Sequence, residues 1–333
     1  MKKYNLTAIG NALVDIEFRV KDDFFPENSI EKGVMTLIDE SRHTELLSQL
    51  QNNYKMEKRA GGGSAANTVV TAAQFGASTF YCCKVGNDEF GEFYKKDLAE
   101  AGVTHALLEQ NDVGETGKCL VMITEDADRT MNTFLGITGT LGPDQVVKDA
   151  VADSEYFYIE GHLMYSDLAV EAILDAKKIA RENGVKVAAT VSDPAVVKYV
   201  RPNLERILGD DGVDILFCNA EEASDFGGGS LEEGVEAFRK YAKLLVVTEG
   251  ENGATIYCES LGKLHVDPYT VEALDTTGAG DTFAGAFLYG LTHGLSAQKS
   301  GELANRTAAE CVANFGPRIS KEKQSEIFNG LHL

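Results

Sequence analysis

Short apolar runs alternate with longer amphipathic segments along most of this 333-residue chain. The short runs have the length and residue types of buried strands, whereas the longer segments repeat apolar residues at helical spacing. The expected strands are residues 7–9, 79–85, 156–159, 185–190, 215–218 and 244–248. The expected helices are residues 41–51, 65–75, 89–101, 167–183, 221–225, 231–241 and 281–293. This alternation predicts βαβ units and a mostly parallel central sheet with helices on both faces, which is an α/β fold.

Two stretches interrupt the alternation and predict a second, smaller sheet. The stretch 13–38 contains VDIEFRV, in which apolar and polar residues alternate, and later VMTLI. Residues 118–124 and 129–134 are expected to pair as a hairpin around an acidic turn. Alternating strands suit a sheet that packs one face on the main body and exposes the other. We therefore expect one domain spanning 1–333, with a lid whose strands come from about 13–38 and 116–136.

The segment DTTGAGDTF at 275–283 carries the clearest chemical signal. Gly278 and Gly280 leave the backbone open to a ligand, and an apolar helix follows, whose first amide groups have no partners within the helix. Such a helix start binds anions. Asp281 repels an anion but can act as a base on a nucleophile that attacks it. The alternative is a glycine-rich loop in which Asp281 only caps the helix.

Two further motifs contain candidate ligands for a hydroxyl group. The segment AGGGSAANT at 60–68 places three glycines before an apolar helix. Asn67, one turn into that helix, can both donate and accept a hydrogen bond, although a tight loop with a capping Asn would look similar. Asp15 lies in an otherwise apolar strand, where a buried carboxylate needs partners. The alternative for Asp15 is a strand residue that faces solvent.

Composition narrows the class of partner. The net charge of −21 argues against nucleic acid, which requires a basic face. No apolar run reaches membrane-spanning length, and the N-terminal residues do not form the apolar core of a signal peptide. No two histidines have the helical spacing of a zinc site. The cysteines have no C-x-x-C spacing and predict buried thiols in a cytoplasmic protein: Cys82, Cys83, Cys119, Cys218, Cys258 and Cys311.

The two glycine-rich segments carry a family resemblance. Residues 275–283 resemble the C-terminal signature of the ribokinase-like (PfkB) kinases of sugars and nucleosides, whose core is G-A-G-D. Residues 60–68 resemble the N-terminal signature of the same family, although Val69 replaces a small residue. The resemblance spans nearly the whole chain. It implies a ribokinase-like three-layer fold with a small β-sheet lid, and phosphoryl transfer from ATP, with Mg²⁺, to an alcohol of a small molecule.

The resemblance also implies a role for each matching residue. Asp281 would be the base, with an anion hole and a lid arginine formed by Gly278, Ala279, Gly280 and Arg129. The acceptor would contact Asn11, Asp15, Gly62, Gly63 and Asn67. ATP would lie against Asn219, Thr248, Gly250 and Gly253, and Glu222 would support Mg²⁺ through water. A monovalent cation, K⁺, would bind at Asp275, Thr277, Cys311, Asn314, Gly316 and Ser320.

Three of these matches have simpler alternatives. Asn219 and Glu222 have the spacing of a helix cap and a first-turn acid. Residues 248–254 read equally as an ordinary strand and turn. Arg129 follows an acidic turn and fits an ordinary hairpin charge.

Within the family, the adenosine kinase branch is the most similar. GNALVD at 10–15 is similar to its G-N-P-L-L-D opening, and VDILFCNAEEA at 213–223 is similar to V-D-I-L-F-G-N-E-x-E-A. This similarity implies a ribonucleoside acceptor of the adenosine type, phosphorylated on its 5′-hydroxyl. HLM at 162–164 replaces the aromatic residues that stack on the base, which leaves Phe18, Leu13 or Leu135 to form an apolar wall.

Other functions remain as alternatives. Because the stacking ring is missing, the main alternative is a sugar kinase of the same family, acting on ribose, fructose or a related sugar. An inactive sugar sensor fits less well because a pure binder needs no base. A dinucleotide-dependent oxidoreductase also fits less well, because no G-x-G-x-x-G follows the first strand. The sequence is compatible with a monomer or a homodimer.

Overall fold

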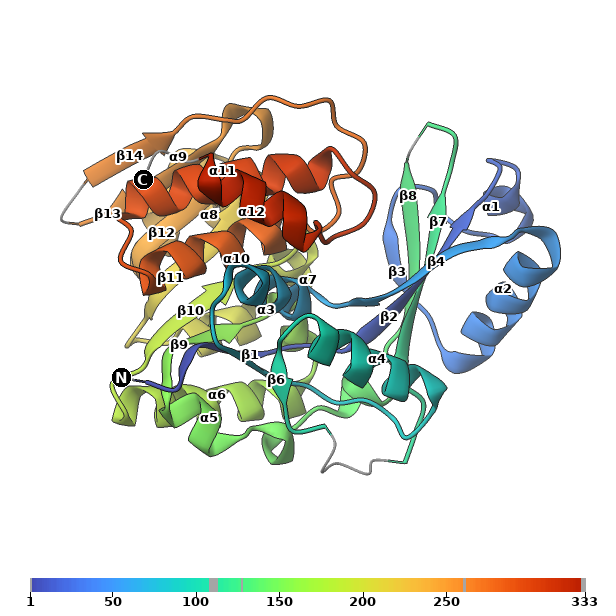
Figure 1. Cartoon of the computed structure of the whole chain (residues 1–333), viewed down its shortest axis with the longest axis horizontal. Coiled ribbons are helices and arrows are strands. Elements are labelled where there is room, and N and C mark those ends of the chain that lie inside the picture. Colours follow the sequence, from blue (N-terminus) through green and yellow to red (C-terminus); the bar gives the residue numbers. More distant parts are fainter. Residues whose placement is uncertain (1, 108–112, 127, 260–261, 331–333) are drawn as a thin grey trace.

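The main body is built on a nine-stranded sheet in a computed structural model that describes residues 2–107, 113–126, 128–259 and 262–330 (Figure 1). The strand order is β14-β13-β12-β11-β10-β9-β1-β5-β6. All neighbours from β12 to β6 are parallel, and β13 and β14 continue the sheet antiparallel. The strands are β1 (Tyr4–Ile9), β5 (Thr79–Cys82), β6 (Thr104–His105), β9 (Ser154–Ile159), β10 (Lys186–Thr190), β11 (Val213–Asn219), β12 (Ala242–Thr248), β13 (Ala254–Cys258) and β14 (Gly262–Val266).

Helices cover both faces of this sheet. One face carries α3 (Ser64–Phe75), α4 (Glu89–Glu100), α10 (Ala279–Thr292), α11 (Ala297–Val312) and α12 (Lys321–Asn329). The other face carries α5 (Lys148–Ala152), α6 (Asp167–Glu182), α7 (Pro194–Leu208), α8 (Ala220–Gly227) and α9 (Leu231–Phe238). Each layer has its own apolar core against the sheet, so the predicted three-layer α/β fold is confirmed.

A second sheet of five strands stands at one side of the main body (Figure 1). Its order is β3-β8-β7-β2-β4, and β7 and β8 form the expected antiparallel hairpin. Two helices accompany it, α1 (Phe24–Glu27) and α2 (Glu40–Asn53). We call this sheet with its two helices the lid. Its strands are β2 (Leu13–Arg19), β3 (Met35–Leu37), β4 (Met56–Gly62), β7 (Gly117–Ile123) and β8 (Arg129–Phe134).

Several elements were not expected from the sequence, among them strands β4, β13 and β14 and helices α7, α11 and α12. Strand β4 lies outside the predicted lid ranges because its sequence, MEKRAGG, has no apolar alternation and its first half is exposed. Its ladder with β2 holds it in the sheet. Helix α7 was missed because Pro202 lies inside it, and Val200 departs from helical geometry at φ −130° and ψ 26°. Among the described helices, none is long and apolar enough to cross a membrane.

The parallel strands end at one edge of the main sheet, and the lid attaches there. Asn11 follows β1, Glu160 follows β9, and Asn219 and Thr248 end the neighbouring strands β11 and β12. Helix α3 continues directly from lid strand β4. Open α/β sheets bind ligands outside the carboxyl ends of their strands. The residues that end or follow these strands therefore belong to the region of the fold where a ligand is expected.

Candidate active site

The loop before α10 is shaped by glycine. Gly278 caps the helix in a left-handed conformation (φ 75°), and a Cβ on it would lie 2.4 Å from the Cβ of Pro317. A larger residue would therefore suffer both strain and a clash. Around a Cβ on Gly280 there is open space within 4 Å. The amides of Gly280 and Asp281 belong to the first turn, which offers them no carbonyl within the helix, so the loop can receive an anion.

The side chain of Asp281 joins this loop to helix α3. Ser64 Oγ donates to Asp281 Oδ1 at 2.6 Å, and Asn67 Nδ2 donates to Asp281 Oδ2 at 3.0 Å. Burial raises the pKa of Asp281 to about 6, against the opposing effect of the two hydrogen bonds and of Arg318. The carboxyl is thus mostly ionised at neutral pH while remaining easy to protonate, and its role as a base stays a prediction. The two glycine-rich motifs meet here, as the family resemblance implied.

Asp15 lies on lid strand β2 directly against the glycine segment that precedes α3. A Cβ on Gly62 would lie 2.4 Å from Asp15 Oδ2, and a Cβ on Gly63 would lie 2.1 Å from the carbonyl oxygen of Asn11. Burial raises the pKa of Asp15 to about 7, and the charge of Arg318 opposes this rise. The predicted acceptor ligands therefore lie close together, but their contact with an acceptor stays a prediction.

Arg129, the expected lid arginine, lies at the start of β8 and is buried. Its Nη2 lies 2.7 Å from Asp275 Oδ2 and 3.8 Å from Glu17 Oε1. Arg129 therefore connects the lid to the segment that leads into the anion loop, where it pairs with Asp275. A role as a clamp on a phosphoryl group stays a prediction.

The expected cation positions only partly converge. Asp275 accepts hydrogen bonds from the amides of Thr277 (3.0 Å) and Gly316 (2.7 Å). The carbonyls of the same two residues lie 3.5 and 3.7 Å from Cys311 Sγ. These four residues therefore lie together, with oxygen atoms from three of them, but binding of a monovalent cation there stays a prediction. The other two side chains are engaged elsewhere: Asn314 donates to Glu310, and Ser320 caps α12.

The expected nucleotide residues lie at the ends of β11 and β12. Asn219 and Thr248 are register partners, and Gly250 and Gly253 follow with positive φ angles of 58° and 86°. Asn219 and Glu222 form a capping box, in which Glu222 accepts from both the amide and the side chain of Asn219 at 2.9 and 3.0 Å. Burial raises the pKa of Glu222 to about 8. Support of Mg²⁺ through water at this cap stays a prediction.

The buried Glu222 gives a stability prediction. Its folded pKa of about 8 lies far above the unfolded value of about 4.3, so the folded chain binds this proton more tightly. We expect the free energy of unfolding of the wild type, measured without nucleotide, to fall relative to that of Glu222→Gln as pH rises from about 5 to 8. Chemical denaturation across this range measures it, with exposed Glu182→Gln as the control for lost charge. A pH-independent difference would contradict the prediction.

Comparison with known proteins places this geometry in a family. A family model described as pfkB family carbohydrate kinase matches residues 35–324, most of the chain. The chain belongs to the pfkB family of carbohydrate kinases. It is 30% identical to the adenosine kinase of Saccharomyces cerevisiae over 96% of this chain and 98% of that protein. It is 27% identical to the ribokinase of Staphylococcus aureus over 70% of this chain and 75% of that one.

Solved structures agree with this assignment. A probable sugar kinase from Rhizobium etli CFN 42 matches with a TM-score of 0.90 and 34% identity, covering 99% of both chains. The adenosine kinase from Sinorhizobium meliloti matches with a TM-score of 0.89 and 34% identity, covering 97% of this chain and 99% of that one. The chain is therefore a phosphotransferase of an ATP-dependent nucleoside and sugar kinase family, acting on a hydroxyl group.

Three charged residues of this pfkB-family site were not predicted from the sequence: Glu160, Arg318 and Asp97. Glu160 is 1% exposed and accepts from Asn11 Nδ2 at 3.0 Å and from the amide of Ala65 at 2.8 Å, and burial raises its pKa to about 7. The Asn11 side chain thus holds Glu160, and Glu160 holds the start of α3. Arg318 contacts Asn67 and Asp97. An acid at a strand end is a weak signal in sequence, and a single loop arginine is weaker still.

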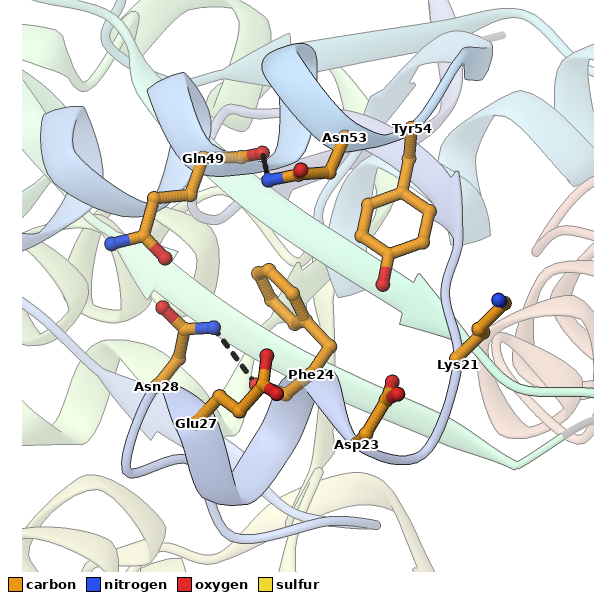
Figure 2. A pocket seen from close by; sticks show the side chains of 8 residues that line it. All are labelled: Lys21, Asp23, Phe24, Glu27, Asn28, Gln49, Asn53 and Tyr54. Carbon is orange, nitrogen blue, oxygen red and sulfur yellow. Dashed lines mark hydrogen bonds between the residues drawn. The ribbon is translucent and has the colours of Figure 1, made fainter.

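A separate hollow of about 490 Å³ lies between α1 and α2 of the lid (Figure 2). Its lining is mostly polar, and the side-chain Nδ2 of Asn28 donates to the backbone carbonyl of Phe24 at 2.8 Å. Its lining residues are Lys21, Asp23, Phe24, Glu27, Asn28, Gln49, Asn53 and Tyr54. None of these residues belongs to the predicted site, so the hollow is distinct from the site around Asp281.

Proposed function

We propose that this pfkB-family kinase transfers the γ-phosphoryl group of ATP to the 5′-hydroxyl of a ribonucleoside of the adenosine type. The observation that carries the proposal is the carboxylate of Asp281 at the start of α10, held by Ser64 and Asn67 beside a loop open to an anion. The full-length similarity to adenosine kinases supports the choice of acceptor.

The proposed reaction assigns one task to each part of the site. The acceptor hydroxyl gives its proton to Asp281 as its oxygen forms the new bond to the γ-phosphorus, and the bond from that phosphorus to the oxygen of ADP breaks. The amides of Gly280 and Asp281 would stabilise charge on the transferred group, and that of Ala279 would join them only after leaving the carbonyl of Thr276, to which it donates at 3.3 Å. Arg129 would assist after exchanging Asp275 for the phosphoryl group. Asp15 would bind the ribose 2′,3′ hydroxyl pair, because a carboxylate accepts from two adjacent hydroxyls.

Two ions complete the proposal. Mg²⁺ bound with ATP would neutralise charge on the phosphate oxygens, and Glu222 of the Asn219–Glu222 cap would support it through water. K⁺ would bind the oxygen cluster of Asp275, Thr277 and Gly316 next to Cys311. In that position its charge would stabilise the conformation of the anion loop.

A free sugar is the second candidate acceptor, because the site lacks at residues 162–164 the aromatic side chains that could stack on the base of a nucleoside. Phe18 cannot replace the missing stacking ring, since its side chain is fully buried in the core. Alternation along β2 points Phe18 away from the face that carries Asp15. Leu13 and Leu135 remain as partly exposed apolar residues, and a Cβ on Gly117 would lie 2.7 Å from Leu13 Cδ2 and 2.6 Å from the carbonyl oxygen of Leu135. A panel of nucleosides and free sugars with ATP, read by ADP release and product mass, decides between the two candidates.

The apolar contact predicts a preference that the panel can measure. We expect the KM for adenosine to lie about tenfold or more below that for ribose, because both offer the same diol but only adenosine has a base to bury. Leu135→Ala should raise the KM for adenosine more than that for ribose. Leu37→Ala, an exposed leucine on β3, is the matched control. A higher kcat/KM for ribose, fructose or another free sugar would replace the nucleoside with the sugar kinase alternative.

A further inference from the structure

Arg318 connects three parts of the site that are distant in sequence. It lies in the loop between α11 and α12, where its Nη1 donates to Asp97 Oδ2 of α4 at 2.6 Å. Its Nε donates to Asn67 Oδ1 at 3.0 Å, and the Nδ2 of the same amide donates to Asp281 Oδ2 at 3.0 Å. An unbroken chain of hydrogen bonds therefore runs from Asp97 to the proposed base.

The direction of these bonds determines how the amide of Asn67 is oriented. A guanidinium can only donate, so the atom facing Arg318 must be the oxygen of Asn67. The NH₂ group of Asn67 must then face Asp281. Without Arg318 the amide could rotate and present its oxygen to the carboxylate, which would place two acceptors together and favour a protonated Asp281.

Two glycines of the family signatures make room for this arrangement. A Cβ on Gly61 would lie 2.3 Å from Asp97 Oδ2 and 3.4 Å from Arg318 Nη2. A Cβ on Gly278 would collide with Pro317, the residue before Arg318. Both glycine-rich segments are thus packed against the Asp97–Arg318 pair or its immediate neighbour. The pair is part of the site and not a surface contact.

The positive charge of Arg318 and its hydrogen bond to Asn67 both favour an ionised Asp281. The charge lowers the pKa of Asp281 and of Asp15, both of which are raised by burial. The other titratable groups facing Asp281 are Tyr158 and Glu160 from β9 and Cys311 from α11. Burial keeps Tyr158 and Cys311 neutral at physiological pH, whereas Glu160 titrates near pH 7. Arg318 is therefore the cation that opposes protonation of Asp281.

One nitrogen of Arg318 indicates that the residue is not optimised for stability. Among the described residues, its Nη2 is buried and has no hydrogen-bond partner. A buried donor without a partner costs free energy, so the site retains Arg318 against that cost.

We propose that Arg318 is a positioning residue that orients the amide of Asn67 and keeps Asp281 ionised for proton transfer. The inference rests on the proposed function of Asp281 as the base. It assigns a role in the reaction to a residue that does not itself need to touch the reacting atoms.

The test compares Arg318→Gln and Arg318→Lys with the wild type in two measurements. The first is the pH dependence of kcat with whichever acceptor the enzyme turns over. We expect Arg318→Gln to shift the acid limb upward by about one pH unit, which lowers kcat about twofold near pH 7 and about tenfold near pH 5, and to recover activity at higher pH. Lysine retains the positive charge but lacks the planar guanidinium that binds Asn67 and Asp97 together. The kcat and the acid limb of Arg318→Lys should therefore lie between those of the wild type and of Arg318→Gln.

The second measurement needs no turnover. A ¹³C titration of the aspartate carboxyl groups in the free protein, with Asp281→Asn identifying the Asp281 signal, should show a higher pKa of Asp281 in Arg318→Gln. Glu160→Gln, measured in parallel, removes a neighbouring carboxyl that titrates in the same range. Arg206→Gln, which removes an exposed ion pair with Glu171 on the outer helices, is the matched control. Thermal unfolding verifies that each variant is folded.

The pH profile and the carboxyl titration together test the proposed role of Arg318. An unchanged acid limb and an unchanged Asp281 titration in folded Arg318→Gln would overturn it. A rise confined to the acceptor KM would also overturn it and would make Arg318 an acceptor ligand. If Asp281→Asn itself keeps wild-type turnover, the proposed base fails, and this outcome is distinct from the failure of Arg318 alone.

Discussion

Replacing Asp281 with asparagine is expected to lower kcat by about 10²–10⁴-fold while the acceptor KM changes little. The substitution keeps the size of the side chain and its hydrogen bond from Ser64, which is 2.6 Å long in the wild type. It removes the ability to take the hydroxyl proton. Steady-state kinetics with saturating ATP and varied acceptor separate the two parameters.

The control for this variant is Asp175→Asn, which changes an exposed aspartate on α6 to the same extent. It should retain wild-type kinetics. If Asp281→Asn also turns over at the wild-type rate, Asp281 is only part of the start of α10 and the proposed mechanism is wrong. A second check is the acid limb of wild-type kcat, which should lie near pH 6, because the base must lose its proton to act.

Replacing Asp15 with alanine should raise the acceptor KM by about 10- to 100-fold and leave the KM for ATP nearly unchanged. Removing one partner of a bound hydroxyl costs roughly 1–3 kcal/mol, and more when that partner is charged. The selectivity for one substrate follows from the location of Asp15, which lies on β2 against Gly62, whereas the expected nucleotide residues end β11 and β12.

Asp23→Ala provides the comparison within the same lid. Asp23 lines the outer hollow between α1 and α2, away from the predicted site (Figure 2). Its replacement should change neither KM. Equal weakening of both substrates by Asp15→Ala, or no weakening at all, would remove Asp15 from the acceptor site.

Much of the fold could be predicted because its signals are local. Buried parallel strands such as β11 are short apolar runs, and their position requires no knowledge of their neighbours. The two signature segments were also local, and the structure joins them through Ser64, Asn67 and Asp281. Strand β4 and helix α7 could not be predicted in this way. A strand partner holds β4, and the packed surroundings of α7 tolerate Pro202.

The candidate site also contains both residues that local sequence patterns identify and residues that depend on distant contacts. Asp281 was found because glycines and a helix start surround it in sequence. Arg318 and Asp97 were missed because they contact each other across 221 residues of sequence, and no motif spacing predicts such a contact. The suggestion that Phe18 replaces a stacking ring is wrong for a reason already present in the alternation of β2. Asp15 and Phe18 are three residues apart and therefore belong to opposite faces.

The connection between Ser64 and Asp281 spans 217 residues, and that between Asn67 and Arg318 spans 251. A folding chain must close both of these very long loops before the proposed base has its partners, and such closures come at an entropic cost that slows folding. During synthesis, α3 leaves the ribosome long before α10 and Arg318 exist. During synthesis the N-terminal segment therefore contains only part of the candidate site. The proposed base can gain all of its partners only when nearly the whole chain has been made.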